Sequence, residues 1–146
     1  ATEAAVREAW RELTDRAPGA DGVIVAEMVP GGVETVVGMS RDELFGPVVM
    51  FGLGGVFVEV LRDVTFRVPP FGRVEARRML GELRGRALLD GVRGRPGADK
   101  DAIVDVIMRV QRLAVDLAGE IAELDINPLV ARPDGCVALD ALVVPA

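Results

Sequence analysis

The chain has 146 residues, half of them hydrophobic, and a formal net charge of −6 at pH 7. This length suits one domain or a large part of one, and the hydrophobic content excludes a disordered chain. The acidic balance argues against nucleic acid or an anionic membrane as the main partner, and a sequence without histidine excludes a histidine triad within this chain.

The first predicted element is a helix over residues 3–16, where Val6, Trp10 and Leu13 recur at helical spacing. The chain starts in this amphipathic stretch without an initiator methionine, as expected of a piece cut from a longer protein. The first residues lack the basic and apolar regions of a secretory signal. A single cysteine, Cys136, excludes a disulfide framework and fits a reducing compartment. We therefore expect a cytoplasmic protein.

Strands are predicted next along the chain. Residues 22–29 are rich in β-forming side chains, and Pro-Gly-Gly at 30–32 separates them from a second such run at 33–40. Two strands joined by these turn residues predict a hairpin. Residues 42–71 predict two or three more strands, with a glycine-rich break at 52–55.

Two helices are predicted in the second half. Residues 73–83 carry apolar side chains at helical spacing, and residues 100–120 form the longest apolar stripe of the sequence. Asp99 or Asp101 is expected near the start of this longest helix as its N-terminal cap.

A final pair of strands is predicted over residues 121–131 and 136–143, joined by a turn at 132–135. Strands and helices alternate along the chain without the regular βαβ pattern of a parallel sheet, and the strand pairs are hairpins. The sequence therefore predicts an α+β domain with a mostly antiparallel sheet packed with helices.

This last hairpin separates apolar from polar side chains, because successive residues of a strand point to opposite faces. The expected apolar sets are Leu124, Ile126 and Val130 on the first strand and Val137, Leu139 and Val143 on the second. The expected polar sets are Glu123, Asp125 and Asn127 on the first strand and Ala138 with Asp140 on the second.

The apolar pattern also predicts the register of the hairpin. A pairing of Val130 with Val137 brings the two apolar faces together, whereas a slip of one residue would turn every side chain over. The same register places Asn127 opposite Asp140, with Cβ atoms roughly 4.5–5.5 Å apart. A three-residue loop would shift the pairing by one, so the turn alone does not fix the register.

Asp125, Asn127 and Asp140 are thus expected to share one small polar surface. Ligands that are all oxygen atoms, few in number and carried by rigid strands suit Mg²⁺, which keeps waters and substrate phosphates in its other positions. The alternative is a solvated sheet face, on which an asparagine opposite an aspartate has no special role.

The motifs of this hairpin resemble the end of the ATP-grasp domain of NDP-forming acyl-CoA synthetases, the acetate–CoA ligase (ADP-forming) family, which is related to succinyl-CoA synthetase. They read Asp-Ile-Asn-Pro-Leu at 125–129 and Gly-x-x-x-Leu-Asp-Ala at 135–141. Further matches in order and spacing are VAEMVPGGVETVVG at 25–38, DELFGPVVMFGLGGVFVEVLRDV at 42–64 and RVPPF at 67–71. The resemblance covers about residues 20–146.

The resemblance implies a role for seven residues. Asn127 and Asp140 match the Mg²⁺ ligands, and Asp125 matches a glutamate that supports the phosphohistidine near the nucleotide in succinyl-CoA synthetases. The adenine ring is bound in that family by the backbone of a hinge segment, which here is Glu27, Met28 and Val29. Glu34 matches a polar position near the ribose or triphosphate.

The resemblance implies a catalytic cycle that this chain cannot complete alone. The parent reaction converts acyl-CoA, ADP and phosphate to carboxylic acid, CoA and ATP through an acyl phosphate and a phosphohistidine. The cofactors implied are Mg²⁺ and ATP or ADP, and the partners are the CoA-binding and phosphohistidine-bearing domains of the parent synthetase. The ATP-grasp subdomain with the phosphate-binding lysine is missing as well, so we expect the isolated chain to be inactive.

Two other functions remain open. One is a succinyl-CoA synthetase β chain, against which the aspartate at position 125 argues. The other is a degenerate ATP-grasp module that regulates a fused acetyltransferase, against which the presence of both Asn127 and Asp140 argues.

Several residues near the motifs also have two interpretations. The glycines at 52–55 form a phosphate loop or only a tight turn between strands, and Glu59 and Asp63 belong to a site or to a solvated edge. Arg67 binds a phosphate or lies free on the surface.

Overall fold

The computed structural model of the chain describes residues 2–55, 62–92, 94 and 96–146. Contacts between Cα atoms divide the chain into two units, Ala1–Pro30 and Gly31–Ala146. The first unit holds helix α1 (Glu3–Arg16) and an extended segment that leads to Pro30. Thr2 caps α1, since its hydroxyl accepts a hydrogen bond from the backbone N–H of Ala5 at 3.3 Å.

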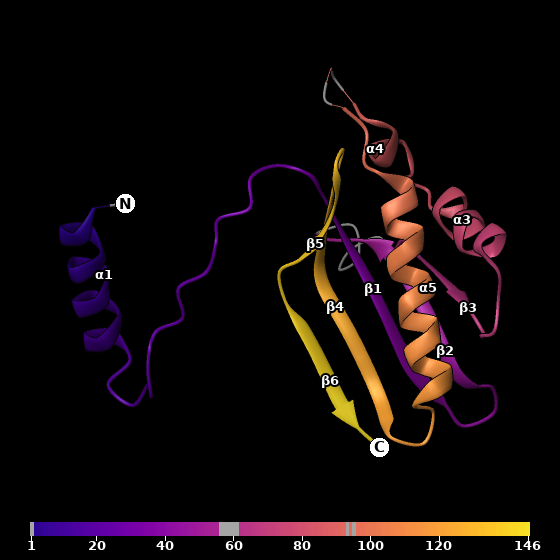
Figure 1. Ribbon diagram of the computed structural model, residues 1–146, viewed down its shortest axis with the longest axis horizontal. Helices are drawn as coiled ribbons and strands as arrows, with labels where there is room; N and C mark the ends of the chain where they lie inside the picture. The colour runs from indigo at the N-terminus through magenta and orange to yellow at the C-terminus, as the bar shows by residue number, and fades with distance from the viewer. Residues whose placement is uncertain (1, 56–61, 93, 95) are drawn as a thin grey trace. The chain divides into compact units, whose positions relative to one another are not determined.

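The second unit is built on a sheet of six described strands, paired antiparallel wherever the structure describes the pairing. The strands are β1 (Val33–Asp42), β2 (Gly46–Leu53), β3 (Val64–Arg67), β4 (Ile121–Arg132), β5 (Gly135–Ala138) and β6 (Ala141–Pro145). Their order is β3-β2-β1-β4-β5, and β6 also pairs with β4. The long strands β1 and β4 therefore form the centre of the sheet, as Figure 1 shows.

The described residues of the second unit also form three helices: α3 (Arg73–Glu82), α4 (Ala87–Asp90) and α5 (Lys100–Asp116). Helix α5 lies along the sheet and contacts β1, β2 and β4, while α3 packs against α5 and β3 (Figure 1). Asp99 caps the N-terminus of α5, because its Oδ1 accepts a hydrogen bond from the N–H of Ala102 at 3.0 Å. The structure thus selects Asp99 from the two predicted caps.

The core fills the space between the helices and one face of the sheet, which we call the covered face. Its strand residues include Val37, Met39, Val49, Phe51, Leu53, Leu124, Leu129 and Ala131. Its helix residues include Met79 and Leu80 of α3 and Ile103, Ile107, Val110 and Ala114 of α5. We call the opposite face the distal face; it carries the alternate residues Glu34, Gly38, Ser40, Met50, Glu123 and Asp125.

Side-chain contacts join α3, α5 and the β3–α3 connection. Arg73 pairs with Asp105 and Arg77 with Asp101, so two ion pairs link the two helices. The Gln111 amide binds the backbone of Phe71 twice: Nε2 donates to the carbonyl oxygen at 2.7 Å, and Oε1 accepts from the N–H at 2.9 Å. This connection is therefore fixed on α5. None of the described helices is both long and apolar enough to span a bilayer.

The α+β class, the mostly antiparallel sheet and the positions of the three long helices agree with the sequence-based predictions. The predicted hairpin of residues 22–29 with 33–40 is wrong, because 22–29 contains no strand. Both edges of β1 are occupied, one by β2 and the other by β4, so no place beside β1 remains. Residues 42–71 supply β2 and β3, with residues 56–61 outside the described part of the chain.

Candidate functional site

A β-bulge in β4 shapes the candidate site. Leu129 faces Thr35 on β1 and Ile126 faces Val37, so Asn127 and Pro128 together oppose the single residue Val36. Because β4 has two residues here opposite one residue of β1, the residues of β4 after the bulge point to the opposite faces from those that strict alternation would give. Leu129 and Ala131 therefore join Leu124 in the core, and the prediction that Val130 shares a face with Leu124 is wrong. Pro128 was a signal for the bulge, since proline within a sheet occurs at edges and bulges.

The register of the hairpin is as predicted despite the bulge. Val130 pairs with Val137, and the ladder resumes with Ile126 opposite Ala141. The second strand is interrupted at residues 139–140, so that β5 and β6 take the place of one continuous strand. Within this interruption, the N–H of Asn127 donates to the carbonyl oxygen of Asp140 at 3.2 Å. Asn127 and Asp140 are therefore direct cross-strand neighbours.

Hydrogen bonds hold the backbone around Asp140. The N–H of Leu139 donates to the carbonyl oxygen of Pro128 at 3.0 Å, and the Oδ1 atom of Asp140 accepts from the N–H of Ala141 at 2.8 Å. The structure shows no hydrogen bond to the remaining oxygen, Oδ2, from the residues that it describes. Both Asn127 and Asp140 are exposed. Their side chains are thus accessible from solvent on a backbone held by hydrogen bonds.

Asp125 lies close to the other polar side chains of this end of β4. Partial burial raises the pKa of its carboxyl group, and the negative charges of Glu123 and Asp140 raise it further, while the amide of Asn127 lowers it. Asp125 and Asn127 lie two residues apart on β4, and Asn127 is the cross-strand neighbour of Asp140. The predicted convergence of Asp125, Asn127 and Asp140 on one polar surface is therefore found in the structure.

The chemistry of these donors fits a hard cation. Asn127 and Asp140 offer amide and carboxylate oxygens, and Asp125 adds a second carboxylate nearby. Among the residues that the structure describes, no three Asp, Glu, Cys or His side chains gather closely enough to hold a metal by themselves. Such a partial oxygen set suits Mg²⁺, which takes one or two protein oxygens and completes its shell with water and phosphate oxygens.

Glu34 borders the glycine turn after β2. The N–H of Gly54 donates to the carbonyl oxygen of Glu34 at 2.7 Å. A Cβ atom on Gly55, whose φ is +60°, would lie 3.5 Å from the carboxylate oxygen Oε2 of Glu34. Glu34 pairs with Val130 of β4, on the same face as Asp125. The carboxylate of Glu34 therefore lies over this turn.

The three predicted hinge residues belong to the other unit of the chain. Glu27 and Met28 are exposed, the latter by 90%, and Val29 is half-buried. They lie in the extended segment before Pro30, without regular secondary structure. Their backbone N–H and C=O groups make none of the hydrogen bonds that join strands within the described residues.

Two residues with open interpretations have structural roles instead. Asp63 is only 5% exposed, and its two carboxylate oxygens accept hydrogen bonds from the backbone N–H groups of Arg84 and Gly85, each at 2.8 Å. A solvated edge is therefore the wrong interpretation of Asp63, while Glu59 lies outside the described residues. Arg67 forms ion pairs with two residues of α3, Glu75 at 3.3 Å and Glu82 at 2.6 Å. The interpretation of Arg67 as a free surface arginine is therefore wrong.

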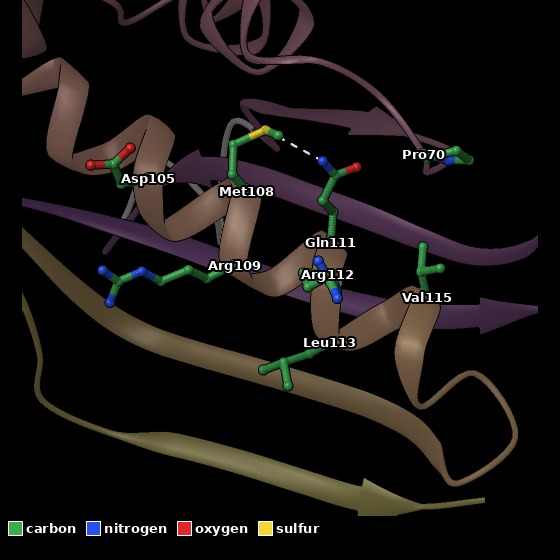
Figure 2. A pocket seen from close by; sticks show the side chains of 8 residues that line it. All are labelled: Pro70, Asp105, Met108, Arg109, Gln111, Arg112, Leu113 and Val115. Atoms are coloured by element: carbon green, nitrogen blue, oxygen red, sulfur yellow. Dashed lines mark hydrogen bonds between the residues drawn. The ribbon is translucent and has the colours of Figure 1, made fainter.

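A groove of about 810 Å³ lies along α5 and Pro70, and Figure 2 shows the side chains that line it. Its apolar members include Met108, Leu113 and Val115, and Met108 Sδ accepts a hydrogen bond from the Gln111 amide at 3.3 Å. Arg112, at the groove, is already paired with Asp116. The groove belongs to the helix side of the sheet, whereas the polar residues of β4 face the other way.

Comparison with known proteins identifies the family. The sequence matches the ATP-grasp domain family over residues 1–144. The chain belongs to the ATP-grasp family. The predicted family resemblance is thereby confirmed.

Two proteins similar to this ATP-grasp chain are named as ADP-forming ligases. It is 46% identical over 144 residues to the β subunit of acetate–CoA ligase [ADP-forming] I of Pyrococcus furiosus, covering 94% of this chain and 62% of that subunit. It is 44% identical over 144 residues to acetate–CoA ligase [ADP-forming] I of Archaeoglobus fulgidus, covering 97% of this chain and 21% of that protein. The chain thus spans less than two thirds of the length of these relatives.

A solved structure of similar fold comes from Ca. Korarchaeum cryptofilum. It is a dinucleotide-forming acetyl-coenzyme A synthetase in complex with coenzyme A and Mg-AMPPCP, with its phosphohistidine segment pointing towards the nucleotide-binding site. The two chains are 43% identical with a TM-score of 0.89, and the match covers 99% of this chain and 65% of that one. This likeness confirms the predicted ATP-grasp fold.

Proposed function

We propose that this ATP-grasp chain is the nucleotide-binding part of an NDP-forming acyl-CoA synthetase. The full-length enzyme interconverts acyl-CoA, ADP and phosphate with carboxylic acid, CoA and ATP, through an acyl phosphate and a phosphohistidine. The named relatives, which are ADP-forming acetate–CoA ligases, support this reaction class. Since the chain contains no histidine, the phosphorylated histidine belongs to another part of the enzyme.

One observation carries the proposal: Asn127 and Asp140 are cross-strand neighbours, joined by a backbone hydrogen bond of 3.2 Å at an exposed interruption of the hairpin. A solvated sheet face needs no such arrangement. Two oxygen donors on a backbone held by hydrogen bonds instead suit Mg²⁺, which takes one or two protein oxygens together with water and phosphate oxygens. Asp125 beside them adds negative charge.

Asn127 Oδ1 and the Asp140 carboxylate would hold the metal in the complete enzyme. When bound there, Mg²⁺ would supply positive charge against the negative charge that develops during phosphoryl transfer. The hydrogen bond from the Ala141 N–H orients the Asp140 carboxylate for this contact. Asp125 is proposed to support the phosphohistidine when that residue approaches the nucleotide, as the glutamate at the matching position does in succinyl-CoA synthetases.

The base and sugar of ATP or ADP are assigned to other residues. The backbone of Glu27, Met28 and Val29 is proposed to bind the adenine ring. In support, the N–H and C=O groups of these residues form no strand pairing within the described part of the chain. Glu34 is proposed to lie near the ribose or triphosphate. The support for this is the place of its carboxylate beside the Gly54–Gly55 turn, on the same face of the sheet as Asp125.

The test is an assay of ATP formation by the full-length enzyme that contains this chain. Acyl-CoA thioesters of different chain length, ADP, phosphate and Mg²⁺ are supplied, and release of CoA is followed together with ATP. We expect both products in equal amounts, and none after chelation of the metal. Release of CoA without ATP, or a full-length protein that acetylates other proteins and forms no ATP, would contradict the proposal.

The isolated chain is expected to bind nucleotide too weakly to matter at cellular concentrations. It provides the acidic part of the site, and phosphoryl transfer also needs a cationic clamp around the phosphates. Calorimetry with Mg·ATP should therefore show no tight site. A micromolar dissociation constant would mean that this chain alone completes the nucleotide site.

The partners proposed for the chain are the CoA-binding and phosphohistidine-bearing parts of the enzyme, together with a CoA thioester and a carboxylic acid as substrates. We also propose a cytoplasmic location, where ADP, ATP and CoA are available. Fractionation of the native source would test this, and recovery of the protein in an extracellular fraction would contradict it.

A further inference from the structure

Gly38 occupies a special position beside the candidate site. It lies in the central strand β1, directly between Met50 of β2 and Asp125 of β4. Leu142 of β6 continues the same cross-strand row beyond Asp125. Phe66 of β3 continues it beyond Met50. Gly38 is thus the one residue of this five-strand row that has no side chain, and it adjoins the carboxylate in the row.

The space beside Gly38 is occupied by the carbonyl oxygen of Leu124 and by the carboxylate of Asp125. A Cβ atom built on Gly38 would lie 2.9 Å from the carbonyl oxygen of Leu124 and 3.4 Å from Oδ1 of Asp125. The Asp125 carboxylate therefore extends over the backbone of β1 at Gly38. A side chain at position 38 would displace this carboxylate, the backbone of β4, or both.

A glycine in the interior of a strand is otherwise unfavourable. It destabilises the strand relative to alanine, because glycine loses more conformational freedom on folding than any other residue. Within a strand, glycine marks a close approach of another group or a bulge. Since β1 forms regular pairs on both sides of Gly38, close approach is the reason here. The nearest group is the backbone carbonyl oxygen of Leu124 on β4, and the Asp125 carboxylate that follows it lies in contact beside it, so a side chain at position 38 would shift β4 at the residue that carries this carboxylate.

We propose that Gly38 is a positioning residue of the synthetase: it leaves the space that holds the Asp125 carboxylate over β1 and beside Asn127 and Asp140. This proposal rests on the proposed role of Asp125. Gly38 touches neither substrate nor metal and acts only through the carboxylate. The sequence carries one signal for it, a lone glycine within a predicted strand.

A double-mutant cycle in the full-length enzyme tests the proposal. Gly38→Ala should lower kcat by about tenfold or more, because misplacing a reacting-site group by about 1 Å is costly, while KM for the nucleotide changes little. In the Asp125→Ala background, the same substitution should change kcat by less than about twofold, since the group on which it acts is gone. Gly81→Ala is the matched control, because a Cβ there meets nothing within 4 Å.

The outcomes separate this proposal from the proposed function. If Gly38→Ala costs the same factor in both backgrounds, Gly38 acts on the fold through Leu124, and the proposal is overturned. If Asp125→Ala alone turns over like the wild type, the proposed role of Asp125 fails first.

A measurement on the unmodified chain covers the case in which Gly38→Ala does not fold. Scalar couplings and nuclear Overhauser effects in the isotope-labelled chain report the χ1 angle of Asp125 and the distance from its β protons to the α protons of Gly38. We expect one rotamer with a strong effect between these protons. Several rotamers, or no such effect, would overturn the proposal.

Discussion

The two faces of the sheet differ in chemistry although the same strands build both. On the covered face, Val37, Phe51 and Ile107 are fully buried between strands and helix α5. On the distal face, β1 and β4 carry Ser40, Glu123 and Asp125. A strand that packs a core on one side can hold polar groups rigidly on the other. The candidate site is therefore held rigid by the packing of core residues that the site itself does not contact.

The largest effect is expected on the covered face. Phe51→Ala should lower the free energy of unfolding by about 3–5 kcal/mol, because it removes a fully buried ring and leaves a cavity. Urea unfolding of the chain measures this. Phe66→Ala is the matched control, since Phe66 is 53% exposed and should cost far less. Equal losses at both positions would contradict the division into a packed and an open face.

The next effect is expected on catalysis rather than on folding. Asp140→Asn in the full-length enzyme should lower kcat for ATP formation by on the order of 10²-fold, about 2.7 kcal/mol, because it removes the charge that holds the metal. Asparagine can still accept the hydrogen bond from the Ala141 N–H, so the melting temperature should hardly change. Steady-state kinetics across a Mg²⁺ series, with a thermal melt, measures both, and excess Mg²⁺ should restore part of the activity.

The control for this variant is Asp134→Asn, in the turn of the same hairpin, where Asp134 pairs with Arg132 at 2.9 Å. It should leave kcat unchanged. Wild-type turnover of Asp140→Asn would exclude Asp140 as a metal ligand. A collapsed melting temperature would instead mean that Asp140 is a structural residue of the hairpin.

A smaller effect is expected at the start of α5, which covers the sheet. Asp99→Ala should destabilise the fold by about 1 kcal/mol, since it removes the acceptor for the Ala102 N–H. Asp99→Asn keeps a capping oxygen and should retain most of the stability. Thermal unfolding of both variants distinguishes them, and an equal loss would point to charge rather than capping.

The smallest effect is a pH dependence of stability with opposite signs at two aspartates. The pKa of Asp125 is raised, mainly by burial, so the folded state holds its proton more tightly than the unfolded chain. As pH rises from below about 4 through this raised pKa, the wild type loses stability relative to Asp125→Asn. The variant should therefore be the more stable protein at pH 7 in the absence of metal.

Asp42 provides the contrast. The N–H groups of Phe45 and Leu44 lower the pKa of its carboxyl group, so Asp42 stabilises the fold at neutral pH and loses this effect as pH falls through the lowered value. Asp42→Asn should therefore be less stable than the wild type at pH 7, and the difference should vanish in acid. Urea titrations between pH 3 and 7 test both signs, and the same sign for both variants would contradict the electrostatic account.

The sequence by itself determined much of the fold and the central pair of the candidate site. Helical periodicity located α3 and α5, and the apolar pattern fixed Val130 opposite Val137, which brought Asn127 to Asp140. These features follow from local spacing, because side-chain periods of 3.6 and 2 are set by backbone geometry alone. The family was also readable from motifs that lie close together in the sequence.

Only the tertiary structure decided the rest. Residues 22–29 have the composition of a strand, yet β2 and β4 occupy both edges of β1, and pairing partners are a property of the whole sheet. The bulge at Asn127 and Pro128 depends on how β4 fits against β1, so it reversed the expected face of Val130. Asp63 became buried because the backbone of Arg84 and Gly85, distant in sequence, meets its carboxylate. Such contacts join segments whose separation along the chain exceeds the range of any local pattern.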